Sequence, residues 1–230
     1  MKEKIIVFTG AGISAESGLG TFRDSGGLWE KYDIHEIATP EAWHKNPDLV
    51  NEFYNMRRKQ CYEANPNKAH LALFELEKYF DVQIITQNID DLHERAGSTN
   101  VIHLHGEINK VKSSGPNAEK TYYPQHHWEV KMGDVCPEGY QFRPHVVWFG
   151  EEVPMMETAI KTMETADIVI VIGTSLQVYP AAGLIHYAPR NAQFYLVDPN
   201  ELNVPTNFKV FKKSAVEGVP RLVAKLISDI

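Results

Sequence analysis

The amino-acid sequence predicts an α/β protein with a doubly wound parallel sheet and a smaller inserted module. Short runs of β-branched and apolar residues, such as 5–9 and 168–172, have the length and composition of strands buried on both faces. Segments with helical character alternate with these runs, which is typical of a parallel sheet. A turn with two glycines, residues 10–14, follows the first run directly. Together these features indicate a Rossmann-like arrangement.

The pattern of apolar residues and helix breakers sets the expected elements in chain order. Proline favours the first turn of a helix and interrupts its interior, so Pro40 marks a helix start and Pro47 divides the run 40–62. The expected strands are 5–9, 82–86, 101–104, 146–149, 168–172, 193–197 and 210–212. The expected helices are 15–19, 40–62, 68–78, 90–96, 155–165, 181–187 and 220–230.

The domain organisation follows from a change of texture along the chain. The regular alternation covers about residues 1–31, 76–105 and 145–230, which we assign to one larger part. A helical insert at about 32–75 and a second insert at about 106–144 form the smaller part. The second insert is polar, aromatic and rich in loops, with no clean period.

Composition excludes several classes of protein. The formal net charge of -7 argues against a nucleic acid as the main partner, because phosphate binding requires a basic face. Two cysteines are too few for a disulfide framework. No stretch approaches the roughly 18 apolar residues of a membrane span, and the N-terminus lacks the pattern of a signal peptide. We therefore expect a cytoplasmic protein that binds neither membrane nor nucleic acid.

The glycine turn indicates a dinucleotide site. Glycines between a strand and a helix let the backbone approach a pyrophosphate, although a tight turn without a ligand is the simpler alternative. The next glycine, Gly18, comes too late for the fingerprint of dehydrogenases. No acidic residue ends a strand about 20 residues further on, where such enzymes hold the ribose. An ordinary oxidoreductase is therefore disfavoured.

Six motifs, read in order, resemble the sirtuins, the NAD-dependent protein lysine deacylases. They are Gly10-Ala11-Gly12-Ile13-Ser14, Thr21-Phe22-Arg23-Asp24, Thr86-Gln87-Asn88-Ile89-Asp90, His103-Leu104-His105-Gly106, Arg143-Pro-His-Val-Val-Trp-Phe-Gly-Glu151 and Gly173-Thr174-Ser175. The resemblance covers residues 5 to about 220 and implies NAD as cofactor. It also implies acylated-lysine proteins or peptides as partners, with nicotinamide, free lysine and O-acyl-ADP-ribose as products.

The resemblance implies a role for each matching position. Asn88 and Asp90 correspond to the polar pair of the nicotinamide pocket, and Gln87 lies beside the nicotinamide ribose. The residues of the NAD loop are Gly10, Ala11, Gly12, Ile13, Phe22 and Arg23, and those of the adenine side are Gly173, Thr174 and Ser175. Asn200 is the expected adenosine-ribose contact, although Asp198 stands where the family usually has a hydrophobic residue.

His105 is the expected catalytic base. An imidazole with an ordinary pKa near 6.5 can take a proton from a ribose hydroxyl at neutral pH. The period of a strand places His103 and His105 on the same face, so spacing alone does not choose between them. The histidine–glycine context of the sirtuin motif favours His105.

Residues 147–150 are the expected peptide-binding segment. Val147, Trp148, Phe149 and Gly150 can pair as a strand edge with an extended substrate, although a buried core strand has the same pattern. By resemblance, Phe149 lines the tunnel for the acyl-lysine side chain.

Three residues indicate the acyl group. Tyr54 and Arg57 are three positions apart and project from one face of a helix. They resemble the pair that holds the distal carboxylate in the sirtuin branch that prefers succinyl and malonyl lysine, where Ala38 matches a small residue that widens the pocket. Arginine and tyrosine suit a carboxylate chemically. The alternative is a solvated helix face.

The second insert departs from the family pattern. Most sirtuins bind a structural zinc ion there with two cysteine pairs, a set of four thiolates. Here Lys110–Gly115 replaces the first pair, and only Cys136 remains of the second. His126 and His127 are poor substitutes, because adjacent side chains point apart on a strand. We expect no metal, and an insert held by the aromatic residues Tyr122, Tyr123, Trp128, Tyr140 and Phe142.

Two other functions fit the same fold. A mono-ADP-ribosyltransferase would pass ADP-ribose to a protein instead of to the acyl group. A non-enzymatic NAD-binding protein would use the altered insert as an interaction surface, but an intact His105, Asn88 and Asp90 argue against it.

Overall fold

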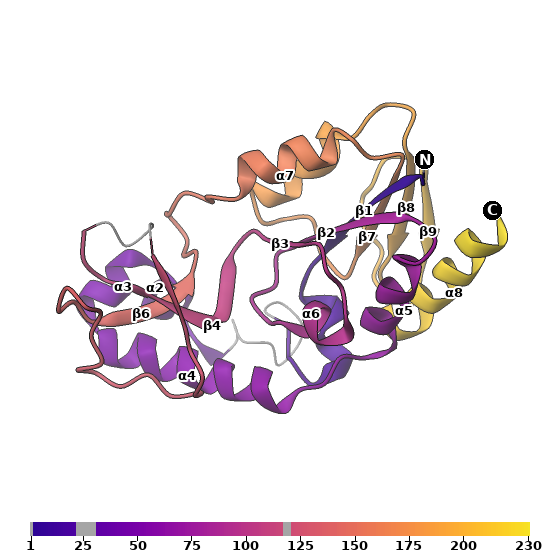
Figure 1. Cartoon of the computed structure of the whole chain (residues 1–230). Helices are drawn as coiled ribbons and strands as arrows, with labels where there is room; N and C mark the ends of the chain where they lie inside the picture. Colours follow the sequence, from indigo (N-terminus) through magenta and orange to yellow (C-terminus); the bar gives the residue numbers. More distant parts are fainter. Residues whose placement is uncertain (1, 22–30, 117–120) are drawn as a thin grey trace.

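A six-stranded parallel sheet forms the centre of the larger part (Figure 1). The computed structural model describes residues 2–21, 31–116 and 121–230. The strand order is β3-β2-β1-β7-β8-β9, and every neighbouring pair is parallel. The strands are β1 Lys4–Thr9, β2 Asp81–Thr86, β3 Val101–His103, β7 Ile168–Ile172, β8 Gln193–Val197 and β9 Phe208–Phe211. The predicted α/β fold class is confirmed.

The direction of winding reverses in the middle of the sheet. The chain runs outward from β1 to β3 on one side and from β7 to β9 on the other. At such a switch point, the connections after the two central strands lead to helices on opposite faces of the sheet, so a crevice forms at the carboxyl ends of the strands. The fold thereby places the glycine turn after β1 beside the segment that follows β7.

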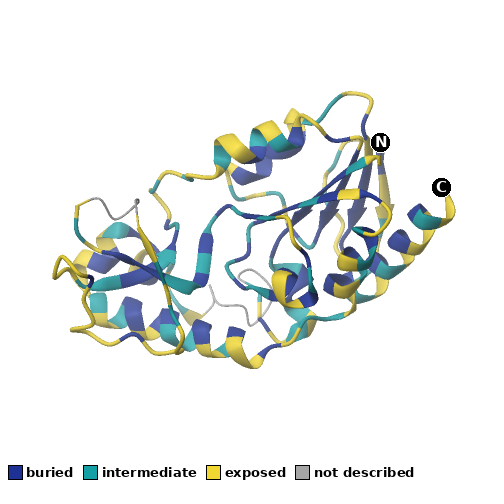
Figure 2. Cartoon of the chain, in the orientation of Figure 1, coloured by how far each residue is buried: buried dark blue, intermediate teal, exposed yellow. Residues whose placement is uncertain are grey.

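Helices cover both faces of the sheet. Along β1, Ile5 and Val7 pack under α5 (Lys68–Leu76) and α8 (Ala215–Ser228), whereas Ile6 and Phe8 belong to the opposite core. The opposite face carries α7 (Met156–Met163) and the 3-10 helix η3 (Ala181–Tyr187). Figure 2 shows the central strands as almost wholly buried, as the burial of β1, β7 and β8 confirms. Within the described ranges, no helix is both long and apolar enough to cross a bilayer.

The smaller part combines helices with an antiparallel sheet. Its helices are α2 Ile34–Ile37, α3 Pro40–Lys45 and α4 Pro47–Glu63, and its strands, in the order β5-β4-β6, are β4 Gly106–Ser113, β5 Tyr122–Pro124 and β6 Phe142–Val146. Thr39 and Asn46 cap α3 and α4, each with proline directly after the cap, as the sequence predicts. The domain boundaries assigned above stay a prediction.

Several predicted elements are wrong in type or extent. The strand predicted at 146–149 ends at Val146, because the following amides bond elsewhere: Val147 N donates to His105 O at 2.9 Å and Phe149 N to Ala38 O at 3.0 Å. The last helix begins at Ala215 instead of Pro220, since the Glu16 carboxylate accepts from the amide of Val216 at 3.2 Å. The runs predicted as helices at 15–19 and 181–187 form the 3-10 helices η2 (Ala15–Ser17) and η3.

A polar stripe on α4 anchors the second insert. The stripe consists of Asn51, Asn55, Arg58 and Tyr62, whose spacing of four, three and four places them on one helix face. Asn55 exchanges two hydrogen bonds of 2.9 Å with the backbone of Val130, and Asn51 also donates to the Val130 carbonyl. Tyr62 donates to the carbonyl of Gln125 at 2.6 Å. Helix side chains thus tie down a loop that has little regular structure.

Arg58 is the central member of this stripe. It is fully buried, and its guanidinium donates to the carbonyls of Ile108 at 2.7 Å and Trp128 at 2.9 Å and to Asn55 Oδ1 at 2.8 Å. Burial lowers the pKa of Arg58 to about 10, so the group stays charged at neutral pH. One side chain therefore joins α4, β4 and the 125–130 segment.

The expectation that aromatic residues hold the insert is wrong in part. Tyr122, Trp128 and Tyr140 are each at least 40% exposed. Tyr123 and Phe142 do contact each other, with ring centroids 5.0 Å apart. Among the described residues, no cluster of three or more His, Cys, Asp or Glu side chains could hold a metal, and buried Cys136 contacts Ser113. The donor set does not fit the zinc ion that most sirtuins carry.

We predict that Arg58→Met lowers the free energy of unfolding by about 2–4 kcal/mol, because two backbone carbonyls lose a charged donor. Urea unfolding of the full chain measures this change. Arg221→Met, at an exposed position of α8, is the control and should cost under about 1 kcal/mol. A chelator in excess should leave the unfolding midpoint unchanged; a fall would show that a metal does hold the insert.

Candidate active site

A single large cleft collects the predicted site residues. It has a volume of about 570 Å³ and opens at the carboxyl ends of β1, β2, β7 and β8. Of the predicted positions that the structure describes, all line this cleft except Ile13, whose side chain lies in the core. Phe22 and Arg23 lie outside the described residues. The loops of the sheet supply Gly10, Ala11, Gly12, Gln87, Asn88, Asp90, His105, Gly173, Thr174, Ser175 and Asn200.

The glycine turn packs directly on the loop after β7. A Cβ at Gly12 would lie 2.6 Å from Gly173 Cα, and one at Gly10 would lie 2.7 Å from Thr174 Cβ. The amide of Gly12 donates to the carbonyl of Gly173 at 2.8 Å, so it is used within the protein. The two glycines are thus required for the packing of these loops. Ala11, which stands between them, lines the cleft.

Polar side chains form the floor beside this turn. Asn88 Nδ2 donates to Ser14 Oγ at 3.2 Å, and Gln87 Nε2 donates to Thr174 Oγ1 at 2.8 Å. Asp90 is buried, and this burial raises the pKa of its carboxyl, although the Leu92 amide and the Ser14 hydroxyl act in the opposite direction. The floor therefore offers amide and carboxyl groups in a place with little water.

His105 lies in the cleft wall with a defined tautomer. Its Nδ1 is 2.9 Å from the carbonyl of Gln87, which can only accept a hydrogen bond. In the neutral ring Nδ1 therefore bears the hydrogen, and Nε2 keeps its lone pair. Burial lowers the pKa of His105, partly offset by the Gln87 carbonyl, so the ring is neutral at pH 7.

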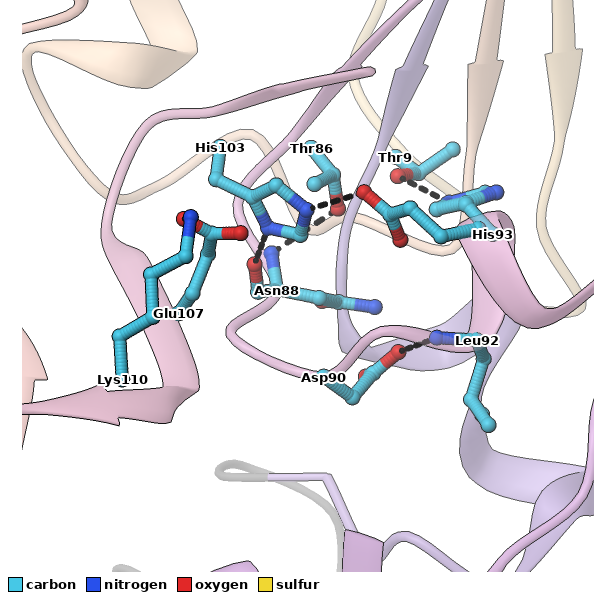
Figure 3. A network of polar contacts seen from close by, with 10 residues as sticks. Thr9, Thr86, Asn88, Asp90, Leu92, His93, His103, Glu107 and Lys110 are labelled. Atoms are coloured by element: carbon cyan, nitrogen blue, oxygen red, sulfur yellow. Dashed lines mark hydrogen bonds and ion pairs between the residues drawn. The ribbon is translucent and has the colours of Figure 1, made fainter. Parts of the chain in front are cut away.

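His103 is separated from this wall. Strand β3 ends at His103, and the turn that follows reaches Gly106 with a φ of +82°, so the period of a strand does not extend from His103 to His105. His103 contacts the Asn88 carbonyl at 3.0 Å and the Glu94 carboxylate at 2.8 Å instead, as part of the network in Figure 3. His105 lines the cleft, and His103 lies behind it.

Tyr54 and Arg57 lie together at the inner end of the cleft, beside Ala38. Their exposed fractions are 4% and 6%, so the alternative of a solvated helix face is wrong. Arg57 Nη1 donates to Gln60 Oε1 at 2.9 Å. Burial lowers the pKa of Arg57 and raises that of Tyr54, so at neutral pH a buried cation stands beside an intact phenol.

Trp148 fixes the hydroxyl of Tyr54. Its indole Nε1 donates to the tyrosine oxygen at 3.0 Å. The indole ring is itself held by Arg143, whose Cζ lies 3.3 Å from the ring centroid, and Arg143 pairs with Glu151 through contacts of 2.8 and 3.1 Å. Glu151 also accepts from the Trp148 amide at 2.8 Å. The motif 143–151 is thus a frame for the inner end of the cleft.

The four residues predicted to bind peptide have different environments. Trp148 is buried, whereas Phe149 is 45% exposed at the mouth of the cleft. Val147 and Gly150 line the cleft as well. Cys61 and Ser14 also line it, although neither was predicted; Cys61 follows Arg57 by four residues, so the helical period was the available signal.

The comparisons with known proteins agree with this geometry. The sequence model of the Sir2 family matches residues 10–180. An "NAD-dependent protein deacylase" of Bacteroides thetaiotaomicron is 54% identical over 231 residues, which cover 98% of each chain. A crystal structure of a Sir2 homolog–NAD complex is 38% identical with a TM-score of 0.88, covering 99% of this chain and 91% of that one. A Sir2 complex with deacetylated p53 peptide and 3′-O-acetyl ADP-ribose is 29% identical with a TM-score of 0.81, covering 97% and 94%.

A doubly wound sheet with a glycine turn and a cleft at its switch point defines a dinucleotide-binding α/β protein. Because the family model matches residues 10–180 and the Bacteroides relative is 54% identical over 98% of the chain, the chain belongs to the Sir2 family, the sirtuins. The resemblance inferred from the six motifs is confirmed.

We predict that Gly12→Ala destabilises the protein by about 1–3 kcal/mol, because the added methyl group overlaps the backbone of Gly173. The two loops must separate, so NAD binding should weaken as well. Urea unfolding and calorimetric titration with NAD measure the two effects. Gly183→Ala is the matched control, since its added Cβ meets only Tyr179 at 3.8 Å; an equal loss in both variants would contradict the loop contact.

Proposed function

We propose that this sirtuin is an NAD-dependent protein lysine deacylase that removes succinyl and malonyl groups in preference to acetyl groups. Family membership and the deacylase relative support the general reaction. The observation that carries the acyl preference is the buried pair Tyr54 and Arg57, which shares one cleft with His105. A buried arginine beside a tyrosine hydroxyl suits a ligand that ends in a carboxylate.

The residues of the cleft fit NAD. The cofactor's phosphates would lie along the turn at Ala11, which lines the cleft. Gly10 and Gly12 in this turn bear no side chain, because a Cβ at either position would overlap the loop after β7. By resemblance to the family, Phe22 and Arg23 would also contact the cofactor. Gln87, Asn88 and Asp90 would hold the nicotinamide riboside, with the adenosine end held by Gly173, Thr174, Ser175 and Asn200. Bound NAD supplies a nicotinamide–ribose bond whose cleavage exposes the sugar carbon to the acyl oxygen.

His105 acts as the base in this proposal. Its Nε2 accepts the proton of a ribose hydroxyl, and the Gln87 carbonyl holds the ring in the tautomer that leaves Nε2 unprotonated. The buried side chains of Asn88 and Asp90 would lie beside the nicotinamide riboside and would keep water from it. A fixed geometry of amide oxygen, sugar carbon and imidazole removes much of the entropic barrier.

Recognition of the acidic acyl group follows from hydrogen-bond polarity. Trp148 donates to the oxygen of Tyr54, so the hydroxyl hydrogen of Tyr54 is available for another acceptor. The guanidinium of Arg57 adds charge-assisted donors for a carboxylate. Ala38 leaves room for the longer acyl chain. An acetyl group offers neither charge nor length.

The remaining expectations complete the proposal. Val147, Phe149 and Gly150 would bind the substrate backbone at the cleft mouth, with acylated-lysine proteins or peptides as partners. We also propose that the protein acts in the cytoplasm and uses neither nucleic acid nor membrane as a partner. The net charge of -7 supports the absence of nucleic acid.

We predict that Arg57→Met lowers kcat/KM for a succinyl-lysine peptide by roughly a hundredfold, because a buried carboxylate loses its charged partner. The value for the acetyl-lysine peptide should change by less than about threefold. Mass spectrometry of acetyl-, malonyl- and succinyl-lysine peptides incubated with NAD measures both. Arg190→Met, which removes an exposed cation elsewhere, is the control. Equal losses with all peptides would refute the acyl preference.

The same reactions distinguish the other functions. A deacylase releases one nicotinamide and one O-acyl-ADP-ribose for each lysine freed. Label from NAD that stays on protein would favour ADP-ribosyl transfer, and NAD binding without nicotinamide release would favour a non-enzymatic protein.

We predict an acid limb of kcat/KM below pH 6.5. The neutral form of His105 is the base, and burial lowers the pKa of His105, so activity should rise with pH through a midpoint under the ordinary value of 6.5. Nicotinamide release measured against pH tests this. His105→Ala should lose about 10²–10⁴ in rate and the limb with it. If His105→Ala keeps the same acid limb, that limb belongs to the titration of another group.

A further inference from the structure

We propose that His103 is a positioning residue whose doubly protonated ring clamps the Asn88 carbonyl to the Glu94 carboxylate and so holds the floor of the active site. The proposal rests on the proposed function in one respect: Asn88 and Asp90 must serve the reaction. Figure 3 shows His103 beside Asn88, with Asp90 further along the same loop.

The two ring nitrogens face groups that can only accept. Nδ1 lies 3.0 Å from the backbone carbonyl of Asn88, and Nε2 lies 2.8 Å from Oε1 of Glu94. A neutral imidazole has one N–H group, so it would turn a lone pair toward one of the two oxygens. Only the imidazolium donates to both. The geometry therefore requires the charged form.

The surrounding charges favour this form. Burial acts to lower the pKa of His103, but the ion pair with Glu94, the Asn88 carbonyl and the charge of Glu107 outweigh it, and the net shift is upward. Reciprocally, burial acts to raise the pKa of Glu94, but His103 and Lys110 lower it below its ordinary value. The charge of His103 also acts to lower the pKa of Asp90.

The other groups near the ring do not cancel this balance. Lys110 on β4 pairs with Glu107, so the two opposite charges partly offset each other near the ring. Burial lowers the pKa of His93 far below the ordinary value, so His93 on α6 (Leu92–Ala96) adds no positive charge at neutral pH. Its Nε2 instead contacts Thr9 Oγ1 at 3.2 Å.

The clamp lies in the middle of a loop that is already held at both ends. At one end, the amide of Asn88 donates to Thr86 Oγ1 at 3.0 Å. At the other end, Asp90 Oδ1 accepts from the amide of Leu92, the first residue of α6, at 3.2 Å. Between these two points, His103 connects the carbonyl of Asn88 to the carboxylate of Glu94 on α6. Loss of the clamp would let the peptide plane after Asn88 rotate and would shift the floor of the cleft.

The two histidines of the motif therefore need opposite protonation states. His105 works when neutral, and His103 holds the floor when charged. The contribution of the clamp is complete below the ordinary pKa of histidine and is lost as pH rises through the raised pKa of His103. The alkaline limb of kcat is thus assigned to His103, with a midpoint above pH 6.5.

The test compares kcat against pH for three variants with a single acylated peptide. In Glu94→Gln the amide can accept from the charged ring or donate to the neutral one, so the alkaline limb should vanish while the plateau remains within about threefold. His103→Ala should lower the plateau of kcat by up to roughly a hundredfold and remove the alkaline limb, with peptide KM little changed. Glu157→Gln, which removes a carboxylate from a surface ion pair on α7, should keep the wild-type profile.

A second measurement is independent of catalysis. Nitrogen-15 NMR of the histidine side chains at pH 7, assigned with His103→Ala, should show both nitrogens of His103 protonated. A neutral His103, or an alkaline limb that survives in Glu94→Gln, would overturn the proposal. If His103 is charged but no peptide is deacylated, the proposed function fails and the charged clamp stands.

Discussion

Two loops at the carboxyl ends of β1 and β7 touch backbone to backbone, and the geometry of the cleft depends on this contact. Only glycine fits where Gly12 and Gly173 meet, since a methyl group there would lie 2.6 Å from the neighbouring backbone. The contact fixes the turn that presents Ala11 and brings Thr174 within reach of Gln87. Through the Gln87 carbonyl it also orients the ring of His105. A steric constraint in the sheet is thereby passed on to the site of proton transfer.

Helix α4 carries two functions on different faces. One face, with Asn55 and Arg58, holds the second insert through backbone carbonyls and amides. The other, with Tyr54 and Arg57, forms the inner end of the cleft. Both arginines are buried, which explains why this helix has a polar sequence although little of it meets solvent. Rigid anchoring on one face keeps the side chains of the other in place.

The sequence predicts the sheet and most of the cleft, because β-branched runs and glycine turns are local signals. It fails where partners come from distant segments. Residues 147–149 have the composition of a strand, but the amide of Phe149 bonds to Ala38, more than a hundred positions away. The period of a strand places His103 and His105 together, but the strand ends between them. Arg58 looks like a surface cation until the carbonyls of Ile108 and Trp128 are in place.

The way in which the second insert is attached bears on the conditions the protein can tolerate. Along its described residues, the hydrogen bonds to α4 come from neutral amides, a phenol and a guanidinium, and none of these groups is easily oxidised or binds metal ions strongly. Peroxide and metal starvation can remove a metal ion that thiolates hold, but these hydrogen bonds involve neither a thiolate nor a metal ion. The attachment of the second insert through these hydrogen bonds therefore depends on neither the redox state nor the metal content of the surrounding solution.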